Sequence, residues 1–202
     1  RVNGDDPTAS DTLIVNGLAN IADGFVFKTG ATPDAGSVTN LGLQPSVTYT
    51  GVEHLKINGQ NSNTGTADTL QLDTFGTDGN IVLTPGSTFD SGHVDVRDAN
   101  FFLVNKATPL DFSGLGTGGS IKLLEAPIEG NGRFDNLIYN GTALSDIFTV
   151  AANGDVTLNT QIVVQTASVV NLTLAGLDGD DIFNIPGNHP FTDSSSTPGS
   201  GT

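Results

Sequence analysis

The chain has 202 residues, of which 36% are apolar and 26 are Gly, and it contains no Cys, Met or Trp. A disulfide framework, a zinc–thiolate site and a thiol nucleophile are therefore excluded. The 22 acidic residues against 7 basic ones give a formal net charge of −15, which disfavours nucleic acid and anionic lipid as partners and attracts divalent cations. No stretch reaches the roughly 18 apolar residues of a membrane span, so we expect no membrane insertion.

Short strands joined by tight turns are the structure that this composition favours. Gly, Thr, Asn and Ser are abundant, and no window of helical periodicity exceeds about two turns. Nineteen of the 22 acidic residues are Asp, which suits turns better than Glu does. We therefore predict an all-β chain.

A short phrase recurs along the chain: an Asp, any residue, and then two large apolar residues spaced two positions apart. It occupies residues 11–15, 23–27, 68–72, 135–139, 146–150 and 181–185. The spacing places both apolar side chains on one face of a strand, and the Asp stands where the chain turns. One strand and one turn, repeated, indicate a repeat architecture. The interior positions predicted from the phrase are Leu13, Phe25, Leu70, Leu137, Phe148 and Phe183.

The repeats group into a domain expected over residues 1–187. Residues 11–72 and 134–185 read as two copies of one unit, with 13–17 matching 137–141 best. Between them, residues 73–133 form a divergent middle, and its strand candidates are 81–83, 94–96, 101–104 and 121–124. Residues 188–202 are rich in Ser, Gly and Pro, so we expect a flexible tail or linker there. No signal peptide is visible, and the chain reads as a mature piece or an excised segment of something longer.

Two architectures accommodate these repeats. In a β-solenoid, resembling a parallel β-helix, each phrase is one rung, equivalent Leu and Phe side chains stack in the interior, and the Asn-Gly pairs form corners. In a β-sandwich the Asn-Gly pairs would form two-residue hairpin turns, which is their local preference. The recurrence of identical side-chain spacing favours the solenoid, because a sandwich does not require its strands to look alike.

Residues 176–184 resemble the calcium-binding nonapeptide of RTX proteins, G-G-x-G-x-D-x-U-x. The matching positions are Gly176, Gly179, Asp181 and Phe183, and the stretch departs from the pattern at Leu177, where the family has Gly. The resemblance implies a Ca²⁺ ion held between successive turns by backbone carbonyls and the Asp carboxylate.

The calcium ligands expected from this resemblance and from the density of carboxylates in Gly-containing turns are Asp178, Asp180 and Asp181, with Asp5 and Asp6 as the second choice. A structural role is the alternative. In that case Asp181 caps its turn by accepting hydrogen bonds from backbone N–H groups.

His93, Asp95 and Arg97 alternate along one predicted strand and are expected on one face of it. A polysaccharide lyase or glycosidase could use such a face for acid or base catalysis. A solvated strand face with ordinary ion pairs is the alternative.

The longer arrangement of Asp phrases and Asn-Gly pairs is similar to the degenerate repeats of very large secreted bacterial surface proteins. This resemblance implies an extracellular or cell-surface location and a structural or adhesive role without enzymatic activity. Both ends of the expected domain present repeat-like edges, so we expect head-to-tail self-association, or contact with neighbouring repeat domains, through residues 1–17 and 172–187. The alternative function is a carbohydrate-binding or polysaccharide-degrading β-helix protein whose partners are surface glycans.

Overall fold

The structure is a computed structural model that describes residues 1–4, 10–41, 46–61, 65–73, 79–98, 106–124 and 135–197. These residues form strands and turns without a helix, so the predicted all-β class is confirmed. Accordingly, they contain no helix that is long and apolar enough to cross a membrane. The strands are β1 (Val2–Asn3), β2 (Thr12–Asn16), β3 (Gly24–Thr29), β4 (Gly36–Asn40), β5 (Val47–Thr50), β6 (His54–Asn58), β7 (Thr69–Asp73), β8 (Gly79–Pro85), β9 (Gly92–Asp98), β10 (Leu110–Ser113), β11 (Ser120–Leu124), β12 (Asp135–Asn140), β13 (Ile147–Val150), β14 (Val156–Leu158), β15 (Val163–Gln165), β16 (Val169–Ala175), β17 (Ile182–Asn184) and β18 (Asp193–Thr197).

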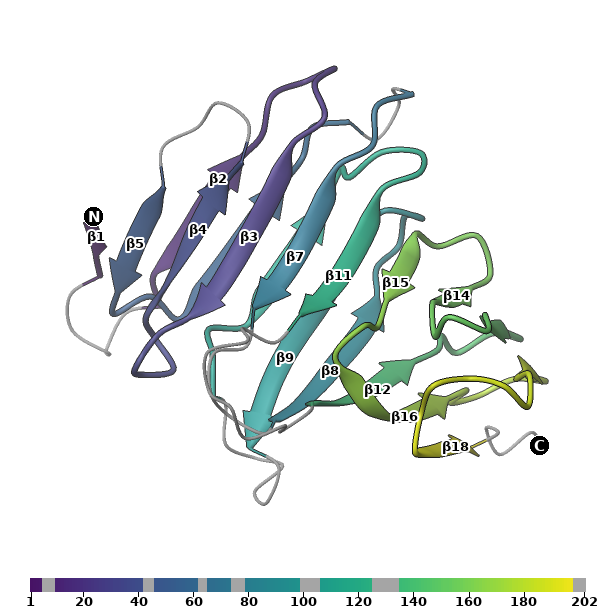
Figure 1. Ribbon diagram of the computed structural model, residues 1–202. Helices are drawn as coiled ribbons and strands as arrows, with labels where there is room; N and C mark the ends of the chain where they lie inside the picture. The colour runs from purple at the N-terminus through teal and green to yellow at the C-terminus, as the bar shows by residue number, and fades with distance from the viewer. Residues whose placement is uncertain are drawn as a thin grey trace.

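The strands form two sheets. Sheet A has ten strands in the order β1-β5-β4-β3-β7-β11-β15-β14-β13-β17, and sheet B has eight in the order β18-β16-β12-β8-β9-β10-β6-β2. The chain passes directly from sheet B to sheet A in five strand pairs, which we call the first to fifth rungs: β2/β3, β6/β7, β10/β11, β12/β13 and β16/β17. The first rung lies near the N-terminus and the fifth near the C-terminus, at opposite ends of the molecule (Figure 1).

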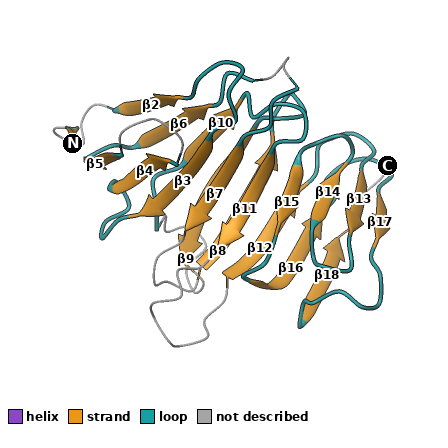
Figure 2. Ribbon diagram, turned by 45° about the horizontal axis from the view of Figure 1, so that its top comes forward, coloured by secondary structure: helices purple, strands orange, loops and turns teal. Residues whose placement is uncertain are grey.

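The first three rungs pair in parallel with one another, and so do the fourth and fifth, with apolar residues beside apolar residues. The hairpin strands β8 and β9 in sheet B, and β14 and β15 in sheet A, separate the third rung from the fourth. In sheet A, Leu70 lies between Phe25 and Ile121. In sheet B, Leu137 lies between residues 81 and 172, which are Ile and Leu. This is the stacking of equivalent side chains that a solenoid requires, and Figure 2 shows the strands of both sheets following one another along the molecule. The Asn-Gly pairs that follow β2, β6 and β12 are corners between the sheets rather than hairpin turns.

Both copies of the predicted unit follow the same route through the sheets. The six strands β2 to β7 and the six strands β12 to β17 each occupy sheets B, A, A, A, B and A in turn. In each copy the three consecutive strands of sheet A form an antiparallel meander, β3-β4-β5 or β13-β14-β15. The internal duplication inferred from the sequence therefore reappears in the topology.

The divergent middle adds one inserted hairpin and one further rung. Strands β8 and β9 pair antiparallel and lie in sheet B between β10 and β12. The strands expected at 81–83, 94–96 and 121–124 are present as β8, β9 and β11. The candidate at 101–104 lies outside the described residues.

The segment expected to be a flexible tail contains a strand. Residues 193–197 form β18, which pairs in parallel with β16 so that Ser194 lies beside Leu172. The preceding Thr192 donates its N–H to the carbonyl of Val170 (3.0 Å). The structure differs from the expectation because an open sheet edge is satisfied by backbone groups, which a Ser-rich segment supplies as well as an apolar one.

The predicted interior positions differ in burial according to whether their strand lies inside a sheet or at its edge. Phe25, Leu70, Leu137 and Phe148 are fully buried, each with 0% exposure. Leu13 and Phe183 are only partly buried, although both pack against the core. These two residues lie on β2 and β17, which are edge strands with a neighbour on one side only. The core is therefore less completely covered at the β2 edge of sheet B and at the β17 edge of sheet A, whereas β18 covers β16 at the other edge of sheet B.

Candidate functional site

Four of the five corners begin with a Gly and end with the Asp of the repeated phrase. The pairs are Gly17 and Asp23, Gly59 and Asp68, Gly141 and Asp146, and Gly176 and Asp181. A Cβ atom placed on any of these glycines would lie between 2.0 and 2.5 Å from Oδ2 of the paired Asp. Such an approach is impossible for a real side chain, so the Asp carboxylate occupies the space that only glycine leaves free.

The corner carboxylates bind backbone N–H groups that have no partner in either sheet. Oδ2 of Asp23 accepts the N–H of Leu18 (2.7 Å), and Oδ2 of Asp146 accepts that of Thr142 (2.6 Å). Oδ1 of a corner Asp accepts a hydrogen bond from a backbone N–H of the neighbouring rung. The N–H of Asp23 donates to Oδ1 of Asp68 (2.8 Å), and the N–H of Asp146 donates to Oδ1 of Asp181 (3.0 Å). The corners are thus closed individually and linked to one another.

Strands β3 and β13 have a hairpin strand, β4 or β14, on one side instead of another rung. There an Asn side chain donates the hydrogen bond to Oδ1 of the corner Asp. Asn40, at the end of β4, donates to Oδ1 of Asp23 (2.7 Å). Asn159, just after β14, donates to Oδ1 of Asp146 (2.6 Å). The sequence reasoning missed both residues, since nothing local distinguishes them from other turn asparagines.

The third corner has no Asp of its own. Gly119 stands beside Asp68, at the position where the other rungs have the Asp. Asp90, from the turn between β8 and β9, accepts the N–H of Gly116 on Oδ2 (3.1 Å) and is fully buried. A carboxylate from the inserted hairpin therefore serves this corner.

The residues expected to bind calcium are placed differently from one another. Asp178 and Asp180 are exposed, whereas Asp181 is a corner carboxylate that accepts the backbone N–H of Asp146 from the neighbouring corner. Asp5 and Asp6 lie outside the described residues. No group of three or more His, Cys, Asp or Glu side chains that could hold a metal ion occurs within the described ranges.

Leu177 marks the departure of this corner from the calcium-binding pattern. Its φ of 67° lies in the left-handed region that favours glycine, and the exposed side chain is a large one for that region. The backbone at this position therefore has a conformation that Gly adopts more readily than Leu.

The cluster around His93 consists of ion pairs. The imidazole lies 2.7 Å from Oδ1 of Asp111 through Nδ1 and 3.1 Å from Oδ1 of Asp95 through Nε2. Arg97 donates to Oδ2 of Asp95 (2.7 Å). His93, Asp95 and Arg97 therefore share one face of β9, as predicted, and β10 adds an acidic residue that the prediction lacked.

The carboxylates determine the protonation of this cluster. The hydrogen bond to Asp95, supported by the one to Asp111, raises the pKa of His93 to about 9 against the effect of burial. The pKa of Asp95 is lowered, chiefly by its hydrogen bond to His93. An imidazolium held between two carboxylates cannot accept a proton at neutral pH, so the geometry favours ordinary ion pairs over a catalytic base.

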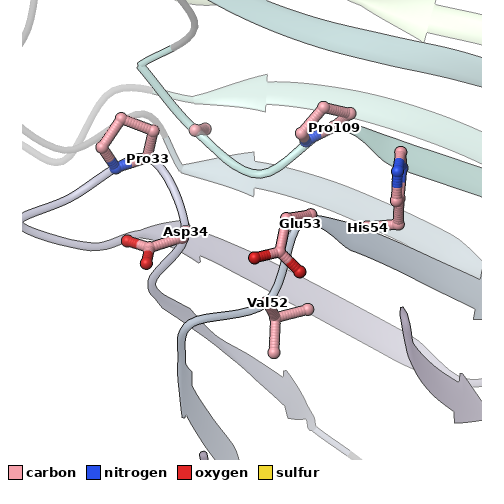
Figure 3. Close-up of a pocket in the computed structure, with 7 residues that line it drawn as sticks. Pro33, Asp34, Val52, Glu53, His54 and Pro109 are labelled. Carbon is pink, nitrogen blue, oxygen red and sulfur yellow. The ribbon is translucent and has the colours of Figure 1, made fainter. Parts of the chain in front are cut away.

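Two surface hollows of about 310 Å³ each adjoin sheet B. The first lies beside the His93 cluster, and the residues that line it are Lys56, Pro85, Gly86, Ser87, Ser91, Gly92, His93, Asp111, Phe112 and Ser113. The second lies where β5 leads into β6, and Figure 3 shows it with Pro33 and Pro109 on one side and the carboxylates of Asp34 and Glu53 on the other. The apolar walls and two carboxylates of this hollow suit a small organic cation better than a metal ion, because Ca²⁺ and Mg²⁺ require more oxygen ligands.

Asp68 differs from the other corner carboxylates. It has 0% exposure, and its Oδ2 has no hydrogen-bond partner among the described residues. The N–H of Gln60, which corresponds to that of Leu18 in the first corner, donates to Asn58 instead (3.1 Å). Burial raises the pKa of Asp68 from 3.8 to about 6, although hydrogen bonds from the Asp23 N–H and from Asn61 lower it.

The raised pKa of Asp68 predicts that the free energy of unfolding depends on pH through this carboxyl group. Asp68→Asn, which cannot titrate, should abolish that dependence. Because the folded chain holds this proton more tightly than the unfolded chain, the contribution of Asp68 to the free energy of unfolding falls as pH rises from about 4 to about 6. Relative to wild type, the variant should gain stability over this range by up to about 3 kcal/mol. Urea denaturation at a series of pH values measures the difference. Asp178→Asn, at an exposed position, serves as the control, and parallel profiles for Asp68→Asn and wild type would contradict the prediction.

Calcium binding stays a prediction. If the metal binds the folded chain alone, the melting temperature should rise from chelator to millimolar Ca²⁺. A variant carrying Asp178→Asn and Asp180→Asn should lose that rise, whereas Asp155→Asn, in the turn between β13 and β14, should keep it. An unchanged melting temperature of the wild-type chain would rule the site out.

Comparison with known proteins found no match: no family model, no curated protein and no solved structure is similar to this chain.

Proposed function

We propose that the chain is a non-enzymatic structural module of an extracellular or cell-surface bacterial assembly and that it associates end to end. The partners are further copies of the chain or neighbouring repeat domains. The observation that carries the proposal is the incomplete burial at two sheet edges: Leu13 on β2 and Phe183 on β17 are partly buried, whereas the equivalent residues between them are fully buried.

The position of the exposed apolar side chains supports the same proposal. Among the described residues, the large hydrophobic side chains that are exposed are Val2, Ile14, Ile21, Leu41, Leu144, Ile147, Leu177 and Ile182. Four of them lie within residues 1–41 and the other four within the last two rungs, and none lies in the described part of residues 42–143. Exposed apolar surface that is confined to particular regions marks interaction sites.

The edge strands offer the backbone groups for such contacts. Among the described strands, β17 pairs only with β13, and β2 pairs only with β6. Each therefore presents unpaired N–H and C=O groups, which readily pair with another chain. The charge of −15 opposes contact between identical chains, but charges farther apart than roughly 8 Å are largely screened in physiological salt.

Glycan binding is the second candidate. One observation favours it: the hollow beside the His93 cluster combines a cationic, an acidic and several hydroxyl side chains on the outer face of sheet B. The apolar ends of the molecule have no role in that function, so end-to-end association accounts for more of the structure.

Association should strengthen with salt and should depend on the free edge of β17. We expect light scattering and sedimentation to show larger species as ionic strength rises, because screening weakens repulsion while edge pairing acts at contact. Ile182→Lys places a charge on the edge strand and should shift the chain toward monomer. Ile147→Lys is the matched control: Ile147 is 47% exposed against 53% for Ile182, lies beside it on the same face, and belongs to a strand that is already paired on both sides.

Both variants change the net charge equally, so a difference between them reports the edge and not the charge. Equal association of the two variants would show that the β17 edge is not the contact. A monomer at every salt concentration would remove the proposed function.

A further inference from the structure

We propose that β17 of one copy pairs in parallel with β1 of the next copy, in the way that β7 pairs with β11 within the chain. The inference rests on the proposed end-to-end association and specifies its contact. The duplicated unit provides the geometry, because one junction of the kind required already exists inside the molecule.

Strand β17 is the counterpart of β7. Each is the sixth strand of its unit, each directly follows a corner Asp, and each lies in sheet A. Counting four residues from Asp68 and Asp181 makes Leu72 equivalent to Ile185. Strand β7 has β11 on its far side, whereas β17 has no strand there. Leu72 is accordingly buried and Ile185 only partly so.

Strand β1 is the counterpart of β11. Strand β11 pairs in parallel with β15, the fourth strand of the second unit, and β1 pairs in parallel with β5, the fourth strand of the first. The other side of β11 carries β7, and the other side of β1 carries no described strand. An incoming β17 would therefore find at β1 the arrangement that β7 finds at β11.

The register follows from the two meanders. Their strand pairings make Val47 on β5 equivalent to Val164 on β15. Val164 lies beside Ile121, and the pairing of β1 with β5 begins two residues beyond Val47, at Val2. Val2 therefore takes the position of Leu123, which is 2% exposed where Val2 is 37% exposed.

The two equivalences together define the contact. Leu72 lies beside Leu123 within the chain, so Ile185, which directly follows β17 in one copy, should extend that strand and lie beside Val2 of the next copy. The preceding residues then pair Asn184 with Arg1, and both positions alternate outward from the core as the strand pattern requires. The pairing concerns sheet A alone, because in sheet B the inserted β8 and β9 occupy the corresponding junction.

An engineered disulfide tests this register directly, since the chain has no native Cys. Paired neighbours in a sheet have Cα atoms within the range of roughly 4.4–6.8 Å that a disulfide spans. Within one molecule β1 and β17 lie at opposite ends, so a bond between them joins two copies (Figures 1 and 2). The double variant Val2→Cys with Ile185→Cys should form a ladder of disulfide-linked multimers under mild oxidation.

The matched control combines Val2→Cys with Leu144→Cys, which is exposed near the same end but lies in a corner and not on the edge strand. We expect at least about tenfold less multimer from this control, because its sulfurs do not meet within the disulfide range. Equal cross-linking of the two variants, or none in either while the wild-type chain associates, would overturn the β17–β1 register and leave end-to-end association standing. A wild-type chain that stays monomeric across the salt series, without cross-linking, would overturn both.

Discussion

The hydrogen bonds of one Asp carboxylate at each corner are the interaction on which the rest of the structure depends. A chain that leaves one sheet for another exposes backbone N–H groups that no strand can pair, and burying them unpaired is costly. Asp23 and Asp146 accept those groups, and the glycine at the start of each corner lets the carboxylate approach. Where neighbouring rungs both have the corner Asp, their strands begin in register, so the apolar residues two and four positions after the Asp lie beside their equivalents.

The hydrogen bonds between neighbouring corners also explain why the two ends of the molecule favour association. A corner carboxylate is completed by the neighbouring rung, as Asp68 is by the N–H of Asp23, or by an Asn where a hairpin intervenes. Strand pairing and side-chain stacking are likewise shared between neighbours. A structure stabilised between nearest neighbours has no natural stopping point. Here Leu13 on β2 and Phe183 on β17 are only partly buried, although β18 covers β16 at the C-terminal edge of sheet B. The proposed assembly extends the rule that already builds the interior.

The spacing of Asp and two large apolar residues was enough to predict the all-β class and four fully buried side chains. The expectation that each phrase forms one rung was wrong, because the phrases at 11–15 and 23–27 lie in the two strands of a single rung, as do those at 135–139 and 146–150. Short-range patterns carry this information, because a corner and the strand after it are contiguous. The roles of Asn40, Asn159 and Asp90 could not be predicted, since each serves a corner that is distant in sequence and is chosen by which hairpin lies beside it. Strand β18 was missed for a related reason: it is held by backbone pairing to β16 and has no apolar pattern.

The importance of the corners is tested most directly by the free energy of unfolding of Gly141→Ala, compared with Gly187→Ala. A Cβ at Gly141 would lie 2.5 Å from Oδ2 of Asp146, whereas one at Gly187 would meet nothing within 4 Å. If the glycine–carboxylate contact positions the rungs, urea denaturation should show a loss of at least about 2 kcal/mol for Gly141→Ala and a change within about 0.5 kcal/mol for Gly187→Ala. Equal, small changes in both variants would contradict the central role of the corner.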